Sequence, residues 1–331
     1  MTGSSSTASP SATPTPTASP IVGVPGTVLI APYVDMGLWP TADLVSMAQA
    51  TGIGAVTAAF VVQQSSTACV PSWGGYAEYN VGSGGDFLPV INAFQQAGGT
   101  VIVSFGGAAG SELAELCTSD ALLLAAYKKV IDRYSITRID FDIEGAAVAN
   151  SANNQRRARV VAQLQKEYAA TGKAIQVSLT LPVMPDGLVA SGLRALKEFA
   201  SAGVHLSSVN VMTMNYGSSG ASMGTHAITA AQATAAQMKT IGAFAGLSNA
   251  QLLARVGITP MLGQNDVPTE IFSLQNARDV AAFAKVNGVG LLAWWEMTRD
   301  RPCGGSIQGL SLCSGVTSPQ WAFAKAFVGA G

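Results

Sequence analysis

The sequence predicts an α/β protein that folds as a (β/α)8 TIM barrel. Eight short runs rich in β-branched residues alternate with longer segments rich in Ala, Leu, Lys and Gln, as strands alternate with helices. The alternation begins at residue 27 and fills the chain to residue 331, a length that suits this barrel. In one run acidic and apolar residues alternate, which fits a strand with one face toward the barrel interior and the other toward helices.

The expected strands and helices follow one another regularly along the chain. The strands are 27–33, 55–62, 100–105, 137–143, 174–180, 208–214, 255–261 and 288–295. The helices are near 41–51, 86–97, 111–134, 153–171, 188–202, 229–245, 275–287 and 318–328. Short polar side chains can accept hydrogen bonds from free backbone N–H groups, which predicts N-caps at Thr41, Ser111 and Ser318. Glycines mark the expected helix ends at Gly172, Gly203 and Gly288.

A doubly wound open sheet is the alternative arrangement of alternating strands and helices. It would need a phosphate-binding or dinucleotide-binding loop after an early strand. The glycine-rich candidates are residues 82–85 and 106–107, and neither fits GxGxxG or a P-loop. The closed barrel is therefore favoured. Between the seventh and eighth strands, residues 261–288 are long enough only for a loop and one helix, so no large insertion domain is expected there.

The N-terminal segment differs in composition from the rest of the chain. Residues 2–20 are almost entirely Ser, Thr, Ala and Pro, a composition that cannot bury enough apolar surface to fold. We expect residues 1–26 to be a linker of a secreted protein and residues 27–331 to be the (β/α)8 domain. Met1 is followed by neither a charged nor an apolar signal region, so the chain as given is expected to be a fragment.

Composition and charge limit the partners. Hydrophobic residues make up 48% of the chain, charged residues 11%, and the formal net charge is −1. Without a basic stripe, nucleic acid and membrane surfaces are not expected partners. Apolar runs are too short to cross a bilayer. We expect a monomer.

The cysteines favour disulfides over a metal site. No pair has CxxC spacing and the chain has only 2 histidines, so neither a zinc site nor a cofactor is expected. Cys303 and Cys313 flank a glycine-rich loop, which favours that pair and hence Cys69–Cys117. Buried free thiols are the alternative.

The acidic run is the candidate for chemistry. In a strand, Asp140, Asp142 and Glu144 share one face and the large apolar residues between them share the other. Three crowded carboxyls cannot all ionise, so at least one should hold its proton near neutral pH, as a general acid must. A solvated edge strand would not alternate with Ile and Phe, and an EF-hand calcium loop needs ligands over twelve residues with a central Gly.

These residues also carry a resemblance. Asp140-x-Asp142-x-Glu144, together with Ser104-Phe105-Gly106-Gly107, resembles glycoside hydrolase family 18, the chitinases, and in particular secreted bacterial, actinobacterial-like catalytic domains. The family signature is DxxDxDxE, and this sequence departs from it at the first position, Thr137. Further resembling segments are Ala31-Pro32-Tyr33, residues 212–216, residues 260–266, Trp295 and Arg299-Asp300.

The resemblance implies a substrate-assisted reaction, in which the 2-acetamido group of the sugar attacks its own anomeric carbon. Glu144 would be the acid and then the base. Asp142 would accept a hydrogen bond from the acetamide N–H, and Asp140 would share a proton with Asp142. Tyr216 would bind the acetamido oxygen through its hydroxyl.

The resemblance also implies substrate contacts. Trp295 would form an apolar floor for a sugar ring, although strand periodicity alone does not choose between Trp294 and Trp295 because both faces of a barrel strand are buried. Weaker expected contacts come from other strand ends: Tyr33, Met214, Asn215, Asn265 and Asp266. Asn215 stands where relatives often have Asp, which removes a charge.

The implied activity is endo-acting, retaining hydrolysis of β-1,4-linked N-acetylglucosamine polymers, with chitin or chito-oligosaccharides as partners. The short segment between the last two strands predicts a shallow, open cleft that suits endo cleavage. Two alternatives stay open: an endo-β-N-acetylglucosaminidase acting on N-glycans, and a non-catalytic carbohydrate-binding or inhibitor protein. The linker further predicts an upstream carbohydrate-binding module and extracellular location.

Overall fold

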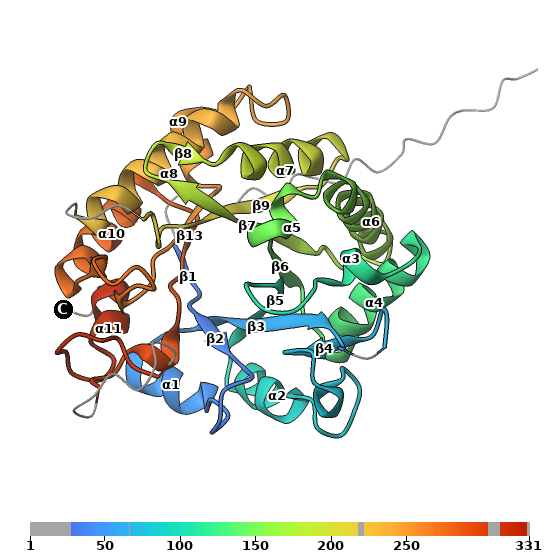
Figure 1. Cartoon of the computed structure of the whole chain (residues 1–331), viewed down its shortest axis with the longest axis horizontal. Coiled ribbons are helices and arrows are strands. Elements are labelled where there is room, and N and C mark those ends of the chain that lie inside the picture. Colours follow the sequence, from blue (N-terminus) through green and yellow to red (C-terminus); the bar gives the residue numbers. More distant parts are fainter. Residues whose placement is uncertain (1–27, 66, 218–221, 304–311, 330–331) are drawn as a thin grey trace, which may run out of the picture.

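The computed structural model describes residues 28–65, 67–217, 222–303 and 312–329. In this part of the chain, parallel strands form a central barrel and helices form a ring around it (Figure 1). The first barrel strand has two segments, β1 (Leu29–Ile30) and β2 (Tyr33–Asp35). The other barrel strands are β3 (Ala55–Gln63), β5 (Thr100–Gly106), β6 (Arg138–Asp142), β7 (Gln176–Met184), β9 (Leu206–Met212), β10 (Val256–Thr259) and β13 (Leu291–Leu292).

The first strand closes the barrel. β1 pairs with β13 and β2 pairs with β3, both in parallel, so the two segments bridge the last strand and the second one. All the other neighbouring barrel strands also pair in parallel. The predicted (β/α)8 barrel is therefore confirmed.

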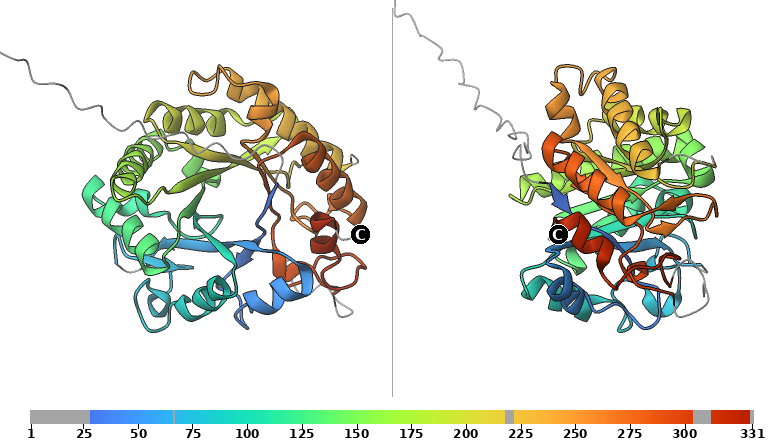
Figure 2. Two further views of the ribbon diagram at one scale, coloured as in Figure 1. Left: turned by 180° about the vertical axis from the view of Figure 1, so that it is seen from behind. Right: turned by 90° about the vertical axis from the view of Figure 1, so that its left-hand side faces the viewer.

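The helices cover the outer face of the barrel, as the views in Figure 2 also show. One long helix follows each strand: α1 (Leu44–Thr51), α2 (Leu88–Gln96), α4 (Asp120–Arg133), α6 (Ser151–Ala170), α7 (Ala190–Ser201), α8 (Met223–Lys239), α10 (Leu274–Asn287) and α11 (Ala322–Val328). Short helices α3 (Leu113–Leu116), α5 (Gly145–Ala149) and α9 (Asn249–Leu253) lie in the connections. No helix in the described residues is both long and apolar enough for a bilayer.

Several helix starts differ from the prediction. The N-caps are Asp43, Glu112 and Trp321, so Thr41, Ser111 and Ser318 were wrong. Residues 111–134 form two helices, α3 and α4, and α8 starts six residues before the predicted 229. Two of the observed caps are acidic residues one or two positions beyond the predicted ones: Asp43 accepts from the Ser46 N–H, and Glu112 forms a capping box with Glu115. The predicted ends are confirmed, since Gly172, Gly203 and Gly288 have positive φ angles of 77°, 81° and 65°.

The chain between β10 and β13 is short, as predicted. It holds only the hairpin of β11 (Gly263–Gln264) and β12 (Ile271–Phe272) before α10, with no inserted domain.

Both predicted disulfides are confirmed, Cys69–Cys117 and Cys303–Cys313. Residues 1–26, the predicted linker, lie outside the described residues, so the division into linker and catalytic domain stays a prediction.

Candidate active site

The acidic strand lies as its alternation predicts. Ile139, Phe141 and Ile143 are buried in the core between the barrel and the helices, where Phe141 stacks on Phe105 at 5.4 Å between ring centroids. The carboxyl residues face the barrel interior. Asp142 is the last residue of β6, and Glu144 is the N-cap of α5. The acids therefore reach the carboxyl-terminal end of the strands, where barrel enzymes carry their active sites.

Asp140 is surrounded by hydroxyl groups from neighbouring strands. Its Oδ2 accepts hydrogen bonds from the Ser104 hydroxyl at 2.7 Å and from the Tyr33 hydroxyl at 3.0 Å. Its Oδ1 accepts from the hydroxyls of Ser178 at 2.6 Å and Thr180 at 2.8 Å. Burial raises the pKa of Asp140, and the four hydroxyls oppose that rise by stabilising the carboxylate. Asp140 is thus fixed in position from both sides.

Tyr33, a predicted sugar contact, is held by polar side chains inside the barrel. Its side chain is buried, and its hydroxyl meets Asp140 as well as the Thr180 hydroxyl at 2.9 Å. The Asn210 side-chain amide donates to both of these hydroxyls, at 3.3 and 3.0 Å, and accepts from the Thr259 hydroxyl at 2.8 Å. Tyr33 is therefore part of a polar network that supports Asp140, and its contact with a sugar stays a prediction.

Asp142 and Glu144 are the acids with raised pKa values nearest the opening. The pKa of Asp142 lies well above its usual range because of burial and then because of the charges of Glu144 and Asp140. Burial, and after it the charge of Asp266, raises the pKa of Glu144. Asp142 Oδ1 is buried without a hydrogen-bond partner in the described chain. The raised pKa values favour retention of a proton by the pair, and Asp142 Oδ1 is left as an acceptor.

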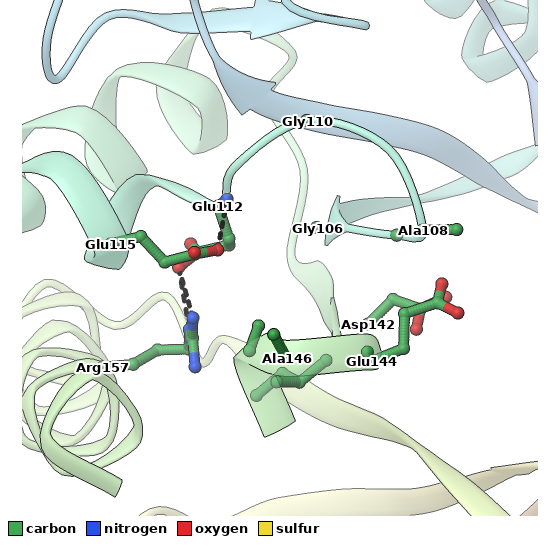
Figure 3. A pocket seen from close by; sticks show the side chains of 13 residues that line it. Gly106, Ala108, Gly110, Glu112, Glu115, Asp142, Glu144, Ala146 and Arg157 are labelled. Atoms are coloured by element: carbon green, nitrogen blue, oxygen red, sulfur yellow. Dashed lines mark hydrogen bonds and ion pairs between the residues drawn. The ribbon is translucent and has the colours of Figure 1, made fainter. Parts of the chain in front are cut away.

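A cavity of about 280 Å³ adjoins the two acids. Figure 3 shows Asp142 and Glu144 at one end of it and Glu112, Glu115 and Arg157 at the other, with the loop from Gly106 to Gly110 above.

Gly106 forms part of the cavity wall, and no larger residue fits at its position. It has a φ of +104°, and an added Cβ would lie 2.1 Å from the Asp142 carbonyl oxygen. The neighbouring Gly107 N–H donates to that same oxygen at 3.0 Å. The loop is thereby tied to the end of the acidic strand.

The two adjacent tryptophans face opposite sides of the last strand. Trp294 is buried and stacks on Phe327 of α11, with ring centroids 4.6 Å apart. Trp295 is half-buried, stacks on Phe60 at 5.5 Å and lies 6.0 Å from Tyr33. Of the two, only Trp295 can offer an exposed ring face. Phe60 was missed in the sequence, because nothing in a continuous apolar run marks one aromatic residue as half-exposed.

Tyr216 lies just beyond the sixth strand. Its ring packs edge-on against His226 at 5.4 Å, and its backbone N–H donates to Glu270 at 3.0 Å. Its hydroxyl is buried and has no hydrogen-bond partner among the described residues. Burial raises the pKa of Tyr216, and the charge of Glu270 adds to this. The hydroxyl is therefore neutral and able to donate, but it does not contact the acids directly.

The loops after the sixth and seventh strands are joined. Asn215 has a φ of +54°, and its amide group exchanges hydrogen bonds with Asp266: Asn215 Nδ2 donates to the carboxylate at 2.8 Å and Asn215 Oδ1 accepts from the backbone N–H at 2.9 Å. Both side chains are exposed, and Met214 is half-buried.

Asn265 is fully buried, and its amide nitrogen donates to the carbonyls of Met261 and Gly263. It shapes the loop, and its contact with a sugar stays a prediction.

The segment after Trp295 holds neighbouring loops in place through buried charged side chains. Glu296 is fully buried, and burial raises its pKa to about 7. Arg299 donates to the carbonyls of Leu262 and Gln264 at 2.8 and 2.7 Å, and so holds the loop after the seventh strand. Asp300 accepts from two backbone N–H groups at the start of α11.

Two curated proteins are similar to the chain in sequence, although no protein-family model matches it. It is 35% identical over 313 residues to a probable bifunctional chitinase/lysozyme of Escherichia coli, covering 90% of this chain and 34% of that protein. It is 36% identical over 284 residues to endochitinase 11 of Metarhizium anisopliae, covering 82% of this chain and 52% of that protein. The chain thus spans about a third and about half the length of these relatives.

Solved structures match over nearly the whole chain. The catalytic domain of a hyperthermophilic chitinase from Pyrococcus furiosus has a TM-score of 0.80 and 31% identity, covering 92% of this chain and 96% of that one. Catalytic-site mutants of active domain 2 of the chitinase from that organism, complexed with chito-oligosaccharides, have a TM-score of 0.81 and 30% identity. The match covers 92% of this chain and 95% of that one. A GH18 chitinase from Pseudoalteromonas aurantia shares the fold, with a TM-score of 0.55 and 18% identity over 82% and 95%.

Proposed function

Since the chain belongs to the chitinase family, we propose that it hydrolyses β-1,4-linked N-acetylglucosamine polymers. The observation that carries the proposal is the pair Asp142 and Glu144, which lies beside a cavity at the carboxyl-terminal end of the barrel with both pKa values raised. The Pyrococcus furiosus chitinase mutants complexed with chito-oligosaccharides support the choice of substrate.

Glu144 is the proposed general acid. It transfers its proton to the glycosidic oxygen as the bond from that oxygen to the anomeric carbon breaks. The acetamido oxygen of the same sugar forms the new bond to the anomeric carbon and gives a cyclic oxazolinium ion. The Glu144 carboxylate then takes a proton from water, whose oxygen replaces the acetamido oxygen. Two displacements give overall retention.

Asp142 orients the attacking group. Its unpartnered Oδ1 can accept the acetamide N–H, which fixes the acetamido oxygen and stabilises the positive charge that reaches nitrogen. Asp140, adjacent on the same strand face, is the proton-sharing partner of Asp142 in this proposal. Its four hydroxyl contacts hold its carboxyl in position. Tyr216 contributes a neutral hydroxyl for the acetamido oxygen once the substrate is bound.

Sugar binding uses exposed groups around the acids. Trp295 provides the apolar floor for a sugar ring, and Phe60 extends that surface. Met214, Asn215 and Asp266 line the rim and contact neighbouring sugars or their hydroxyls, since each remains at least partly exposed.

The loops support an endo mode of cleavage. Because only a two-stranded hairpin stands between β10 and α10, no added wall closes the cleft on that side, and a polymer can enter at an internal bond. The proposal is therefore endo-acting cleavage. We further propose that the protein is bacterial, of actinobacterial type, secreted and monomeric. In this proposal residues 1–26 link the catalytic domain, residues 27–331, to an upstream carbohydrate-binding module, which the Ser/Thr/Pro-rich composition of the linker supports.

Product analysis tests the proposal. Chitin hexamers are incubated with the wild-type protein and with Glu144→Gln, and products are separated by mass over time. From the wild type we expect mixed dimers, trimers and tetramers at early times. The Glu144→Gln variant should hydrolyse the hexamer about 10³-fold or more slowly while still binding it. High-mannose glycopeptide serves as the second substrate. Its cleavage in place of the hexamer would favour a glycan-releasing enzyme, and unchanged hydrolysis by Glu144→Gln would reject the assignment of the acid.

A further inference from the structure

A buried ion pair lies across the cavity from the acids. Arg157 on α6 has no exposed surface, and its Nε and Nη2 donate to Glu112 Oε2 at 2.9 and 2.7 Å. Glu112 also accepts from the Tyr127 hydroxyl at 2.5 Å and from the Ala114 N–H at 2.8 Å. Such a pair is held by several hydrogen bonds and has little freedom to move.

The ion pair continues to the helix that begins at the proposed acid. Arg157 Nη1 donates to Asn154 Oδ1 at 2.6 Å, and Asn154 Nδ2 donates to the Val148 carbonyl at 3.1 Å. Val148 lies in the last turn of α5, whose N-cap is Glu144. Helix α5 has 5 residues and is therefore only about 7 Å long. Its two ends, the Val148 carbonyl contact and the Glu144 N-cap, are therefore only about one and a half helical turns apart.

The same pair anchors the loop above the cavity. That loop starts at Gly107, whose N–H binds the Asp142 carbonyl, and ends at Glu112. In Figure 3 the loop and α5 enclose the cavity from two sides, with the ion pair at the end opposite the acids.

We propose that Arg157 and Glu112 are positioning residues that hold Glu144 in place through Asn154 and helix α5. This inference rests on the proposed function, because it assumes that Glu144 is the acid. The pair touches no reacting atom. It fixes the short helix and the cavity wall, and so keeps the carboxyl of Glu144 at its distance from the scissile bond and shielded from water.

A positioning role and a purely structural role predict different pH profiles of kcat. Loosening α5 lets the Glu144 carboxyl turn toward solvent, and since burial is the main cause of its raised pKa, that pKa falls. Asn154→Ala leaves every charged group around Glu144 unreplaced: Asp140 and Asp142 on β6, Asp266 on the neighbouring loop, and Glu112, Glu115 and Arg157 around the cavity. Arg157→Lys keeps a positive charge at its position. The basic limb of the pH profile of kcat should then move to lower pH.

The experiment compares Asn154→Ala and Arg157→Lys with wild type on soluble chito-oligosaccharides. We expect kcat to fall about tenfold or more in both variants, since small misplacements of a reacting group cost that much or more, while KM changes less than about twofold. The basic limb should shift down by about half a pH unit or more.

Arg133→Lys is the matched control. Arg133 makes a similar two-bond ion pair with Asp86, away from the cavity, so this variant should lower Tm without changing kcat or the pH profile. If Arg157→Lys fails to fold, Asn154→Ala decides. Wild-type kcat and an unmoved basic limb in Asn154→Ala would overturn the inference. Absence of hydrolysis by the wild type would instead overturn the proposed function on which it rests.

Discussion

Glu296→Gln should make the protein more stable at neutral and alkaline pH. Glu296 follows Trp295 and is fully buried. Its Oε2 accepts the backbone N–H groups of Thr298 at 3.1 Å and Asp35 at 3.5 Å, and its Oε1 accepts the Thr298 hydroxyl. A glutamine can place its carbonyl oxygen at the first position and donate its amide to the Thr298 hydroxyl at the second. The variant therefore mimics the protonated acid.

The size of the effect comes from the pKa of Glu296. Burial, and then the charge of Asp35, raises this pKa from 4.5 to about 7. Between these values the folded state holds a proton that the unfolded chain has lost, so the free energy of unfolding falls as pH rises. At roughly 1.4 kcal/mol for each pH unit between the two values, the loss is about 3 kcal/mol and is complete above pH 7. Glutamine does not ionise and avoids this loss.

Urea unfolding of both proteins between about pH 4.5 and 8 tests the reasoning. The free energies of unfolding should be similar at the acidic end and differ by about 3 kcal/mol, in favour of Glu296→Gln, at the alkaline end. Burial raises the pKa of Asp300 to about 6, and its contribution cancels because both proteins contain it. Two parallel curves, with a difference independent of pH, would refute the argument.

Two further predictions concern the cavity wall and its charge. Gly106→Ala should lower both the activity and the free energy of unfolding, the latter by about 3 kcal/mol or more, because the added Cβ would lie 2.1 Å from the Asp142 carbonyl oxygen. Gly98→Ala is the control: Gly98 has a φ of +90° but open space around it, so this variant should cost only about 1–2 kcal/mol. Thermal unfolding and turnover measure both effects. Asp266→Asn removes a charge that raises the pKa of Glu144, so the basic limb of kcat/KM should move to lower pH, and less so in high salt; a shift to higher pH would contradict this.

The barrel and the orientation of its acidic strand follow from local rules. Strand side chains alternate with a period of two, so Asp140 and Asp142 could be placed inside, and Ile139 and Phe141 outside, before any tertiary contact was known. Register across parallel strands then brings Ser104 and Ser178 beside Asp140. Ser178 and Thr180 are two residues apart in β7, a spacing that the sequence already contained.

Beyond the strand ends the same rules stop applying. Asn265 sits in a loop and turns its amide onto backbone carbonyls, and Asn215 takes a positive φ to reach Asp266. Local periodicity sets neither the orientation of the Asn265 side chain nor that of Asn215. Tyr33 is a strand residue whose hydroxyl donates to Asp140 in the barrel interior, and this contact between distant strands left no local pattern in the sequence. The ion pair of Glu112 and Arg157 joins residues 45 apart in sequence and left no local pattern.

The stereochemistry of the first product tests the central claim most directly. Hydrolysis of chito-oligosaccharides is followed by proton NMR within the first minutes, before the anomers equilibrate. Substrate-assisted displacement with Glu144 as acid and base predicts that the newly formed reducing end appears as the β anomer and that Glu144→Gln forms essentially none. Initial formation of the α anomer would contradict the account, since it requires water to attack directly.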